Sequence, residues 1–179
     1  MATLPPSIPP THAAIVITHV RDSLALLTVP THAPLPSEAL IRVTWTSSSP
    51  VELHRADGGL LLPAGDAPAN FILGCTFGGT VVALGGEESH LAVGDKVFGF
   101  VQDGDARQAG FQEYVTVPVW RVSKVVEKEG LGVKEAVTVP GNLVTAVHAV
   151  TEDLGLGLAW YVPFFRLPFF FLGYFGMAD

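Results

Sequence analysis

ILGCTFGGTVVALG, residues 72–85, is a strand-like run with two adjacent glycines in its middle. Inside a strand, Gly78 and Gly79 predict either a bulge or the close approach of another backbone. Two strand-like runs follow closely, VGDKVFGFV (93–101) and GFQEYVTVP (110–118). We therefore expect the middle of the chain to form a sheet of short strands punctuated by glycine.

The residues before this region also favour strands. Residues 1–11, rich in proline, predict a loose arm. Residues 12–20 and 24–29 are rich in leucine and β-branched side chains and predict a hairpin. Residues 39–46 alternate in polarity, which is typical of a half-buried strand.

A short helix is expected next, because Ser49 can cap it and Pro50 presets the backbone angle of its first turn. The adjacent glycines at 58–59 predict its end.

The pattern changes towards helix after residue 133. Residues 134–139 are expected to be helical, Pro140 and Gly141 to interrupt the helix, and Asn142 to cap a further helix through Leu154. Many short strands followed by helix predict a mainly β fold, a small and partly open β-barrel with peripheral helices.

The last residues differ in composition from the rest. Residues 161–177 hold six of the eleven phenylalanines, no acidic residue, Arg166 and two prolines. A transmembrane helix needs roughly 20 apolar residues without such interruptions, so membrane insertion is not expected. We interpret residues 154–179 as an atypical aromatic tail from a truncated or mis-spliced end; a flap that binds a partner is the alternative.

Composition excludes several classes of protein. The net charge is −7 and no basic run occurs, which argues against a nucleic acid partner. Cys75 is the only cysteine, so neither an intramolecular disulfide nor a multi-cysteine zinc lobe can form within the chain, and we expect a small buried side chain there. Residues 1–10 lack a basic region followed by an apolar run, which predicts a cytoplasmic protein.

In their order and spacing, the three glycine-punctuated runs resemble the N-terminal, substrate-side domain of medium-chain dehydrogenases/reductases. The resemblance is greatest to the zinc-free branch, which contains quinone reductases and fungal trans-acting enoyl reductases. It is carried by LGCTFGG (73–79), GDKVFGF (94–100), GFQEYV (110–115), the Thr145-Ala146 pair and LGLGLAW (154–160). It implies a GroES-like, alcohol-dehydrogenase-type domain over residues 12–153, followed by the start of a helix that bridges to a missing Rossmann domain.

Compared with the zinc-dependent alcohol dehydrogenases of this superfamily, the chain departs at each ligand position. Ser49 stands at the first ligand position, Cys75 at the histidine and Gly141 at the third. Thr76 stands where those enzymes have glutamate, and where the zinc-free branch has aspartate. One thiolate is not a zinc site, so we expect no metal.

The resemblance implies a substrate cleft lined by residues 47–52, by the turn at Cys75, and by the helix that carries Thr145. Ser49, Glu52, Cys75 and Thr76 are the candidate cleft residues, and Thr145 is a candidate contact for the cofactor amide. The alternative for Ser49 is a helix cap alone, and for Thr145 a helix-face residue alone. No catalytic residue is assigned.

A dinucleotide fold needs a glycine-rich turn between a strand and a helix of a βαβ unit. The glycines at 78–79, 85–86 and 155–157 precede no convincing amphipathic helix. We therefore expect the nucleotide-binding domain to be absent and NADPH, the cofactor of full-length relatives, not to bind tightly to this chain.

Three functions remain open at this stage. The first is the substrate-side domain of a zinc-independent, NADPH-dependent enoyl or quinone reductase, inactive as this truncated chain. The resemblance implies for it a small or carrier-bound enoyl substrate and a polyketide synthase as partner. The second is a non-catalytic GroES-like binding module whose aromatic tail docks on a partner or membrane. The third is a zinc alcohol dehydrogenase, which the ligand positions argue against.

Overall fold

The computed structural model describes residues 4–5, 7–60, 71–86, 90–101, 104–126 and 130–156. The chain divides into two compact units, Met1–Val144 and Thr145–Asp179. All the strands named below lie in the first unit.

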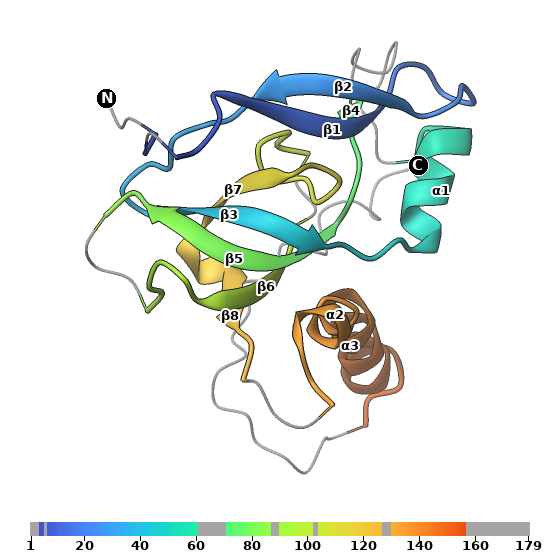
Figure 1. The fold of residues 1–179 in the computed structure, drawn as a ribbon. Coiled ribbons are helices and arrows are strands. Elements are labelled where there is room, and N and C mark those ends of the chain that lie inside the picture. Colours follow the sequence, from blue (N-terminus) through green and yellow to red (C-terminus); the bar gives the residue numbers. More distant parts are fainter. Residues whose placement is uncertain are drawn as a thin grey trace. The chain divides into compact units, whose positions relative to one another are not determined.

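The smaller sheet contains β1 (Thr11–Ile17), β2 (Ala25–Pro30) and β4 (Phe71–Ile72), in the order β2-β1-β4 (Figure 1). Strands β1 and β2 pair antiparallel from Thr11 opposite Pro30 to Val16 opposite Ala25, which confirms the predicted hairpin.

The arm before β1 is packed rather than loose where the structure describes it. Ile8 is buried against Leu40 and Ala83 of the larger sheet. Its apolar side chain anchors the arm to the core.

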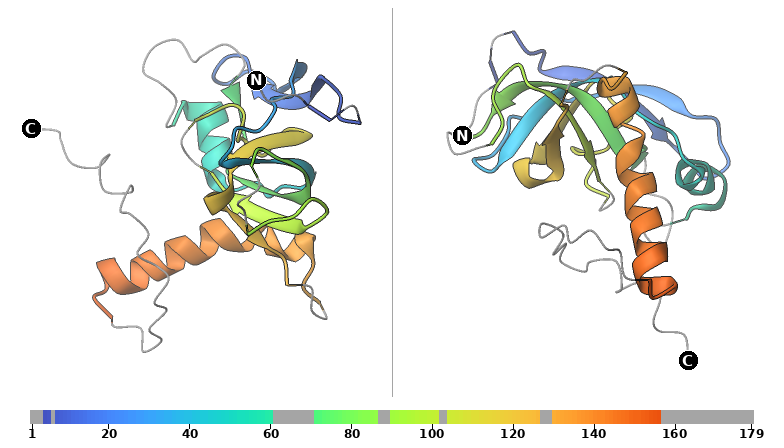
Figure 2. Two further views of the ribbon diagram at one scale, coloured as in Figure 1. Left: turned by 90° about the vertical axis from the view of Figure 1, so that its left-hand side faces the viewer. Right: turned by 90° about the horizontal axis from the view of Figure 1, so that it is seen from below.

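The larger sheet has five strands in the order β7-β3-β5-β6-β8. They are β3 (Glu38–Trp45), β5 (Thr76–Leu84), β6 (Lys96–Phe100), β7 (Tyr114–Pro118) and β8 (Val122–Lys124). Every strand pair in the described ranges is antiparallel. The strands cross at an angle, the usual twist of such sheets, which is visible in both views of Figure 2.

The predicted irregularity at Gly78 and Gly79 is confirmed. The register between β3 and β5 shifts between Val43 and Trp45, opposite these two glycines. A Cβ atom on Gly79 would lie 2.0 Å from the carbonyl oxygen of Arg42, so the two backbones also approach closely there.

The core lies under this sheet and is built from inward-facing side chains of all five strands. Ile41, Phe77, Val81, Val97, Val115, Val117 and Val122 belong to it, with Leu91 and Val101 from the flanking loops. The prediction of a mainly β, partly open barrel with peripheral helices is confirmed, since the described strands form two open sheets.

The helices are α1 (Pro50–Gly58), α2 (Val133–Ala136) and α3 (Val139–His148), and a π-helical turn (Ala149–Asp153) follows α3. Helix α2 packs against β5 and β6 (Figure 1). Helix α1 begins and ends as predicted, with Ser49 as its cap and the left-handed Gly59 (φ 70°) after its last turn.

The predicted interruption at Pro140 and Gly141 is wrong. The break lies at residues 137–138, and Pro140 belongs to the first turn of α3, where its missing N–H costs no hydrogen bond. Asn142 is not a cap, because it lies inside α3 and its Nδ2 donates to the Thr138 carbonyl at 2.8 Å.

Most of the predicted aromatic tail, from residue 157 onward, lies outside the described residues. Within the described ranges, no helix has the length and apolar character needed to cross a bilayer.

Candidate functional site

The first wall of the candidate site is the start of α1. Ser49 and Glu52 form a reciprocal capping box: the Ser49 hydroxyl accepts from the Val51 N–H at 3.3 Å, while Glu52 Oε2 accepts from the Ser49 N–H at 2.8 Å. The Ser49 hydroxyl also donates to Glu52 Oε2 at 2.6 Å. Ser49 thus has the structural role that was the alternative to a cleft role, and its contact with substrate stays a prediction.

Glu52 joins this helix to the turn before β5. Its Oε1 accepts from the Cys75 N–H at 3.0 Å, and the residue is 3% exposed. Burial raises the pKa of the Glu52 carboxyl, but the hydrogen bonds from Ser49 and Cys75 outweigh it and leave the pKa below its ordinary value. Glu52 is therefore a charged brace that brings together three of the predicted residues.

Arg55, which sequence analysis missed, lies one turn further along α1. Its guanidinium is buried, donates from Nη1 to the Cys75 sulfur at 3.3 Å and lies 5.8 Å from the centre of the Phe71 ring. Among the described residues, none bonds its Nε. The only local signal was the three-residue spacing from Glu52, which puts both side chains on one face of α1.

Cys75 is an inert thiol in this setting. Burial raises its pKa to about 11, and the nearby positive charge of Arg55 only partly opposes the shift. Since the thiolate is the nucleophile and the metal ligand, a neutral thiol does neither job at physiological pH. Cys75 was expected to be a small buried side chain, and it is 7% exposed.

We expect iodoacetamide to alkylate native Cys75 at pH 8 roughly 100-fold more slowly than an ordinary protein thiol, because a pKa of about 11 leaves that much less thiolate. Mass spectrometry over time measures the single adduct. The same chain unfolded in urea is the control and should react at the normal rate. Native alkylation at the unfolded rate would contradict the burial and pKa described here.

Glu52, Arg55 and Cys75 form one corner of the candidate site. Next to this corner, Thr76 makes a second polar contact, with Ser47. The two hydroxyl oxygens lie 2.7 Å apart, and Thr76 Oγ1 also accepts from the Ser47 N–H at 3.0 Å. The Thr76 carbonyl accepts from the Thr46 hydroxyl at 2.7 Å. The segment after β3 is therefore held against the start of β5 by hydroxyl groups.

A loop over residues 104–112 lies against the turn at Cys75 and Thr76. The Gly110 N–H donates to the Gly74 carbonyl at 2.8 Å, and a Cβ on Gly110 would lie 1.9 Å from the Thr76 carbonyl oxygen. The position of the Cys75-Thr76 turn thus depends on the course of this loop.

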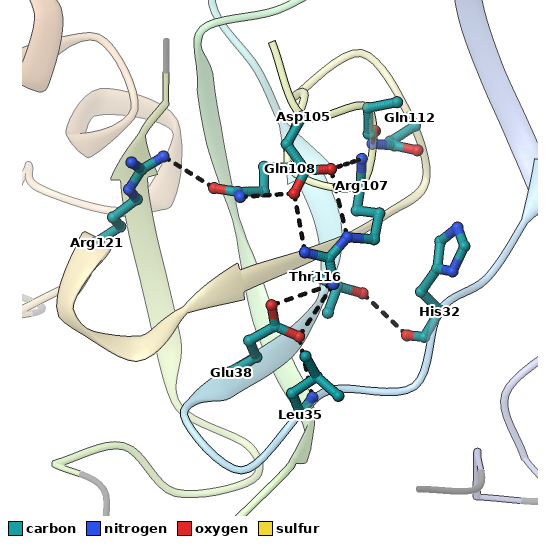
Figure 3. Close-up of polar contacts among 10 residues, drawn as sticks. His32, Leu35, Glu38, Asp105, Arg107, Gln108, Gln112, Thr116 and Arg121 are labelled. Carbon is teal, nitrogen blue, oxygen red and sulfur yellow. Dashed lines mark hydrogen bonds and ion pairs between the residues drawn. The ribbon is translucent and has the colours of Figure 1, made fainter. Parts of the chain in front are cut away.

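Arg107 fixes the loop to the larger sheet (Figure 3). Its Nη1 donates to both oxygens of Glu38, at 3.1 and 3.2 Å, and its Nη2 donates to Asp105 at 2.9 Å. Gln108 also donates to Asp105, and its own side-chain oxygen accepts from Arg121 (both 2.9 Å). No motif in the sequence predicted this network.

Glu113, just before β7, and Tyr114, at its start, both contact β1. Glu113 Oε2 accepts from the Ala13 N–H at 2.9 Å, which ties β1 to the strand that follows Glu113. The Tyr114 ring meets the edge of the buried His12 ring at a centroid distance of 5.5 Å.

Within the described ranges, no group of three His, Cys, Asp or Glu side chains could hold a metal ion. Thr145 lies exposed on α3, in the second compact unit, and its cofactor contact stays a prediction.

Comparison with known proteins assigns the family. Residues 35–148 match the alcohol dehydrogenase GroES-like domain, which includes the capping box, the Cys75 turn and the whole five-stranded sheet. The chain belongs to this family. It is thereby a member of the medium-chain dehydrogenase/reductase superfamily, as the resemblance of its motifs implied.

Among curated proteins, this GroES-like domain protein is 34% identical over 142 residues to the trans-enoyl reductase phmE of Phaeosphaeria nodorum, covering 73% of the chain and 38% of phmE. It is 38% identical over 89 residues to lovC of Aspergillus terreus, the enoyl reductase component of lovastatin nonaketide synthase, covering 48% of the chain and 24% of lovC. The quinone oxidoreductase of Coxiella burnetii is similar in structure, with a TM-score of 0.63 at 25% identity over 79% of the chain and 44% of that enzyme. The chain therefore spans less than half the length of these relatives.

Proposed function

We propose that this GroES-like domain protein provides the substrate-side wall of a zinc-independent oxidoreductase that reduces an activated C=C bond or a quinone with NADPH. The observation that supports this proposal most strongly is the contact between Arg55 and Cys75. At the turn where a zinc alcohol dehydrogenase has a ligand, this chain has a neutral thiol that accepts a hydrogen bond from a buried guanidinium.

The electrostatics of this corner support metal independence. A zinc ion needs deprotonated or neutral ligands with free lone pairs. Arg55 already places a positive charge beside Cys75, and the carboxylate of Glu52 accepts hydrogen bonds from Ser49 and from the backbone of Cys75. A second cation would have to displace these bonds and bear the repulsion of Arg55.

The likeness to phmE and lovC supports an enoyl substrate more than a quinone. Both curated relatives are named as enoyl reductases, and lovC as the enoyl reductase component of lovastatin nonaketide synthase. We extend this to the chain as a carrier-bound α,β-unsaturated thioester with a polyketide synthase as partner.

The residues present do not fit the nucleotide. A dinucleotide site requires a parallel βαβ unit with a glycine-rich turn, whereas all strand pairs in the described part of the chain are antiparallel. We therefore propose that hydride transfer needs a nucleotide-binding domain besides the described sheets, and that the chain by itself is inactive.

Three binding measurements on the purified chain, with a thioester, with NADPH and with zinc, test the three elements of the proposal. We expect crotonyl pantetheine to bind in the millimolar range by NMR, because only one wall of the cleft contributes. We expect no calorimetric signal from NADPH at micromolar concentration and no zinc retained after dialysis. Absence of thioester binding would refute the substrate-side role, stoichiometric zinc would refute metal independence, and micromolar NADPH affinity would refute the account of the nucleotide.

A further inference from the structure

The hydroxyl of Ser47 is incompletely bonded. It has one short contact, 2.7 Å to Thr76 Oγ1, and its next neighbour is the Val137 carbonyl at 3.5 Å, the limit for such a bond. A serine hydroxyl offers one donor and two acceptor positions. Ser47 therefore keeps hydrogen-bonding capacity that its protein neighbours do not use well.

The arrangement of protons follows from the contacts of Thr76. Its oxygen accepts from the Ser47 N–H at 3.0 Å, so its own proton has two destinations: the Ser47 hydroxyl at 2.7 Å or the Ser47 carbonyl at 3.3 Å. The shorter contact is close to the ideal O–H···O distance. When Thr76 donates along it, the proton of Ser47 is left to donate elsewhere.

The difference in burial shows which of the two hydroxyls can reach a ligand. Thr76 is 6% exposed, whereas Ser47 is half-buried. Only Ser47 can meet a ligand, and Thr76 acts through it. A chain of two hydroxyls that donate in the same sense polarises the terminal O–H and strengthens its bond to an acceptor.

The surroundings favour a neutral oxygen as that acceptor. Among the described residues, no charged side chain bonds to Ser47 or Thr76, because Glu52 is bonded to Ser49 and Cys75 and Arg55 to Cys75. A single polarised hydroxyl without a neighbouring charge suits a carbonyl better than a carboxylate or a phosphate.

We propose that Ser47, polarised by Thr76, donates a hydrogen bond to the carbonyl oxygen of an α,β-unsaturated carbonyl ligand. This inference rests on the proposed function and deepens it. It makes Ser47 the substrate-contacting residue and gives Thr76, until now only a cleft candidate, the role of a positioning residue.

The experiment is an NMR titration of the full chain with crotonyl pantetheine labelled with ¹³C at its carbonyl. Ser47→Ala is expected to raise Kd about 5-fold, the value of one neutral hydrogen bond, and to abolish the downfield shift of the bound carbonyl. Thr76→Val retains the Ser47 hydroxyl but removes the group that polarises it, and we expect Kd to rise less, about 2-fold. Ser123→Ala, which removes an exposed serine on β8, is the matched control and should bind like the wild type.

A crotyl thioether of pantetheine lacks the carbonyl and separates a lost hydrogen bond from a disturbed fold. It should bind wild type and Ser47→Ala equally, and the amide spectrum of each variant reports on its fold. If the thioester binds and neither its affinity nor its carbonyl shift depends on Ser47, this inference is overturned while the proposed function stands. If Ser47→Ala weakens both ligands equally, the effect is not a carbonyl bond and the inference is again overturned. If the thioester fails to bind the wild type, both fall.

Discussion

Gly79→Ala is expected to lower the free energy of unfolding by at least about 3 kcal/mol, or to prevent folding altogether. The added Cβ would lie 2.0 Å from the Arg42 carbonyl oxygen and 2.9 Å from its carbon. Both are backbone atoms of β3, so no side-chain rotation relieves the clash. The strands must separate at the register shift that aligns β5, and with it Thr76, against β3.

Gly58→Ala is the matched control, measured by urea unfolding monitored with tryptophan fluorescence. Gly58 closes α1 and has open space around the position of a Cβ. Alanine in a helix is favoured over glycine, so this variant should be neutral or up to about 1 kcal/mol more stable. Equal effects of the two substitutions would show that β3 and β5 do not approach as described.

Local patterns predicted those parts of the fold that local chemistry determines. The hairpin of β1 and β2 followed from β-branched runs around a short turn. Helix α1 followed from Ser49, Pro50 and the glycines that end it, each of which acts within one turn of its own position. The irregularity at Gly79 was predictable because two adjacent glycines inside a strand usually mark a bulge or a close approach of another backbone.

The helical end of the first unit shows the limit of such patterns. Proline disrupts a helix interior but is favoured in the first turn, and the sequence alone did not tell which turn Pro140 occupies. The side chain of Asn142 bonds back to Thr138 instead of capping. Asparagine occurs in similar local sequences whether it caps a helix or bonds back to the preceding turn, so the sequence alone does not separate the two roles.

The candidate site was predicted in part for a related reason. The motifs pointed to Ser49, Glu52, Cys75 and Thr76, and the first three do meet through one carboxylate. Two further residues complete these contacts. Ser47 lies within the predicted lining segment 47–52 but was not a named candidate, and Arg55 lies outside the predicted segments. Glu38 and Arg107 are 69 positions apart in the chain, so only the folded sheet reveals that they are partners.

Arg107→Ala should destabilise the protein by about 2 to 3 kcal/mol at pH 7, because it leaves two carboxylates without their cation. The side chain of Glu38 is only 6% exposed, and those of Arg107 and Asp105 are about one-third exposed, at 30% and 31%. The partial exposure of two members places the effect below that of a fully buried pair. Arg42→Ala, at an exposed arginine on β3, is the control and should change stability little.

The pH dependence of this difference identifies its cause. Burial raises the pKa of the Asp105 carboxyl, but hydrogen bonds from Arg107 and Gln108 outweigh it and hold the pKa below its ordinary value. A lowered pKa in the folded state contributes stability above the ordinary pKa near 4, and this contribution is lost as the pH falls through the folded value. The gap between wild type and Arg107→Ala in urea unfolding should therefore narrow between pH 7 and about pH 3. A gap that stays constant would mean that Arg107 stabilises the loop by packing and not by charge.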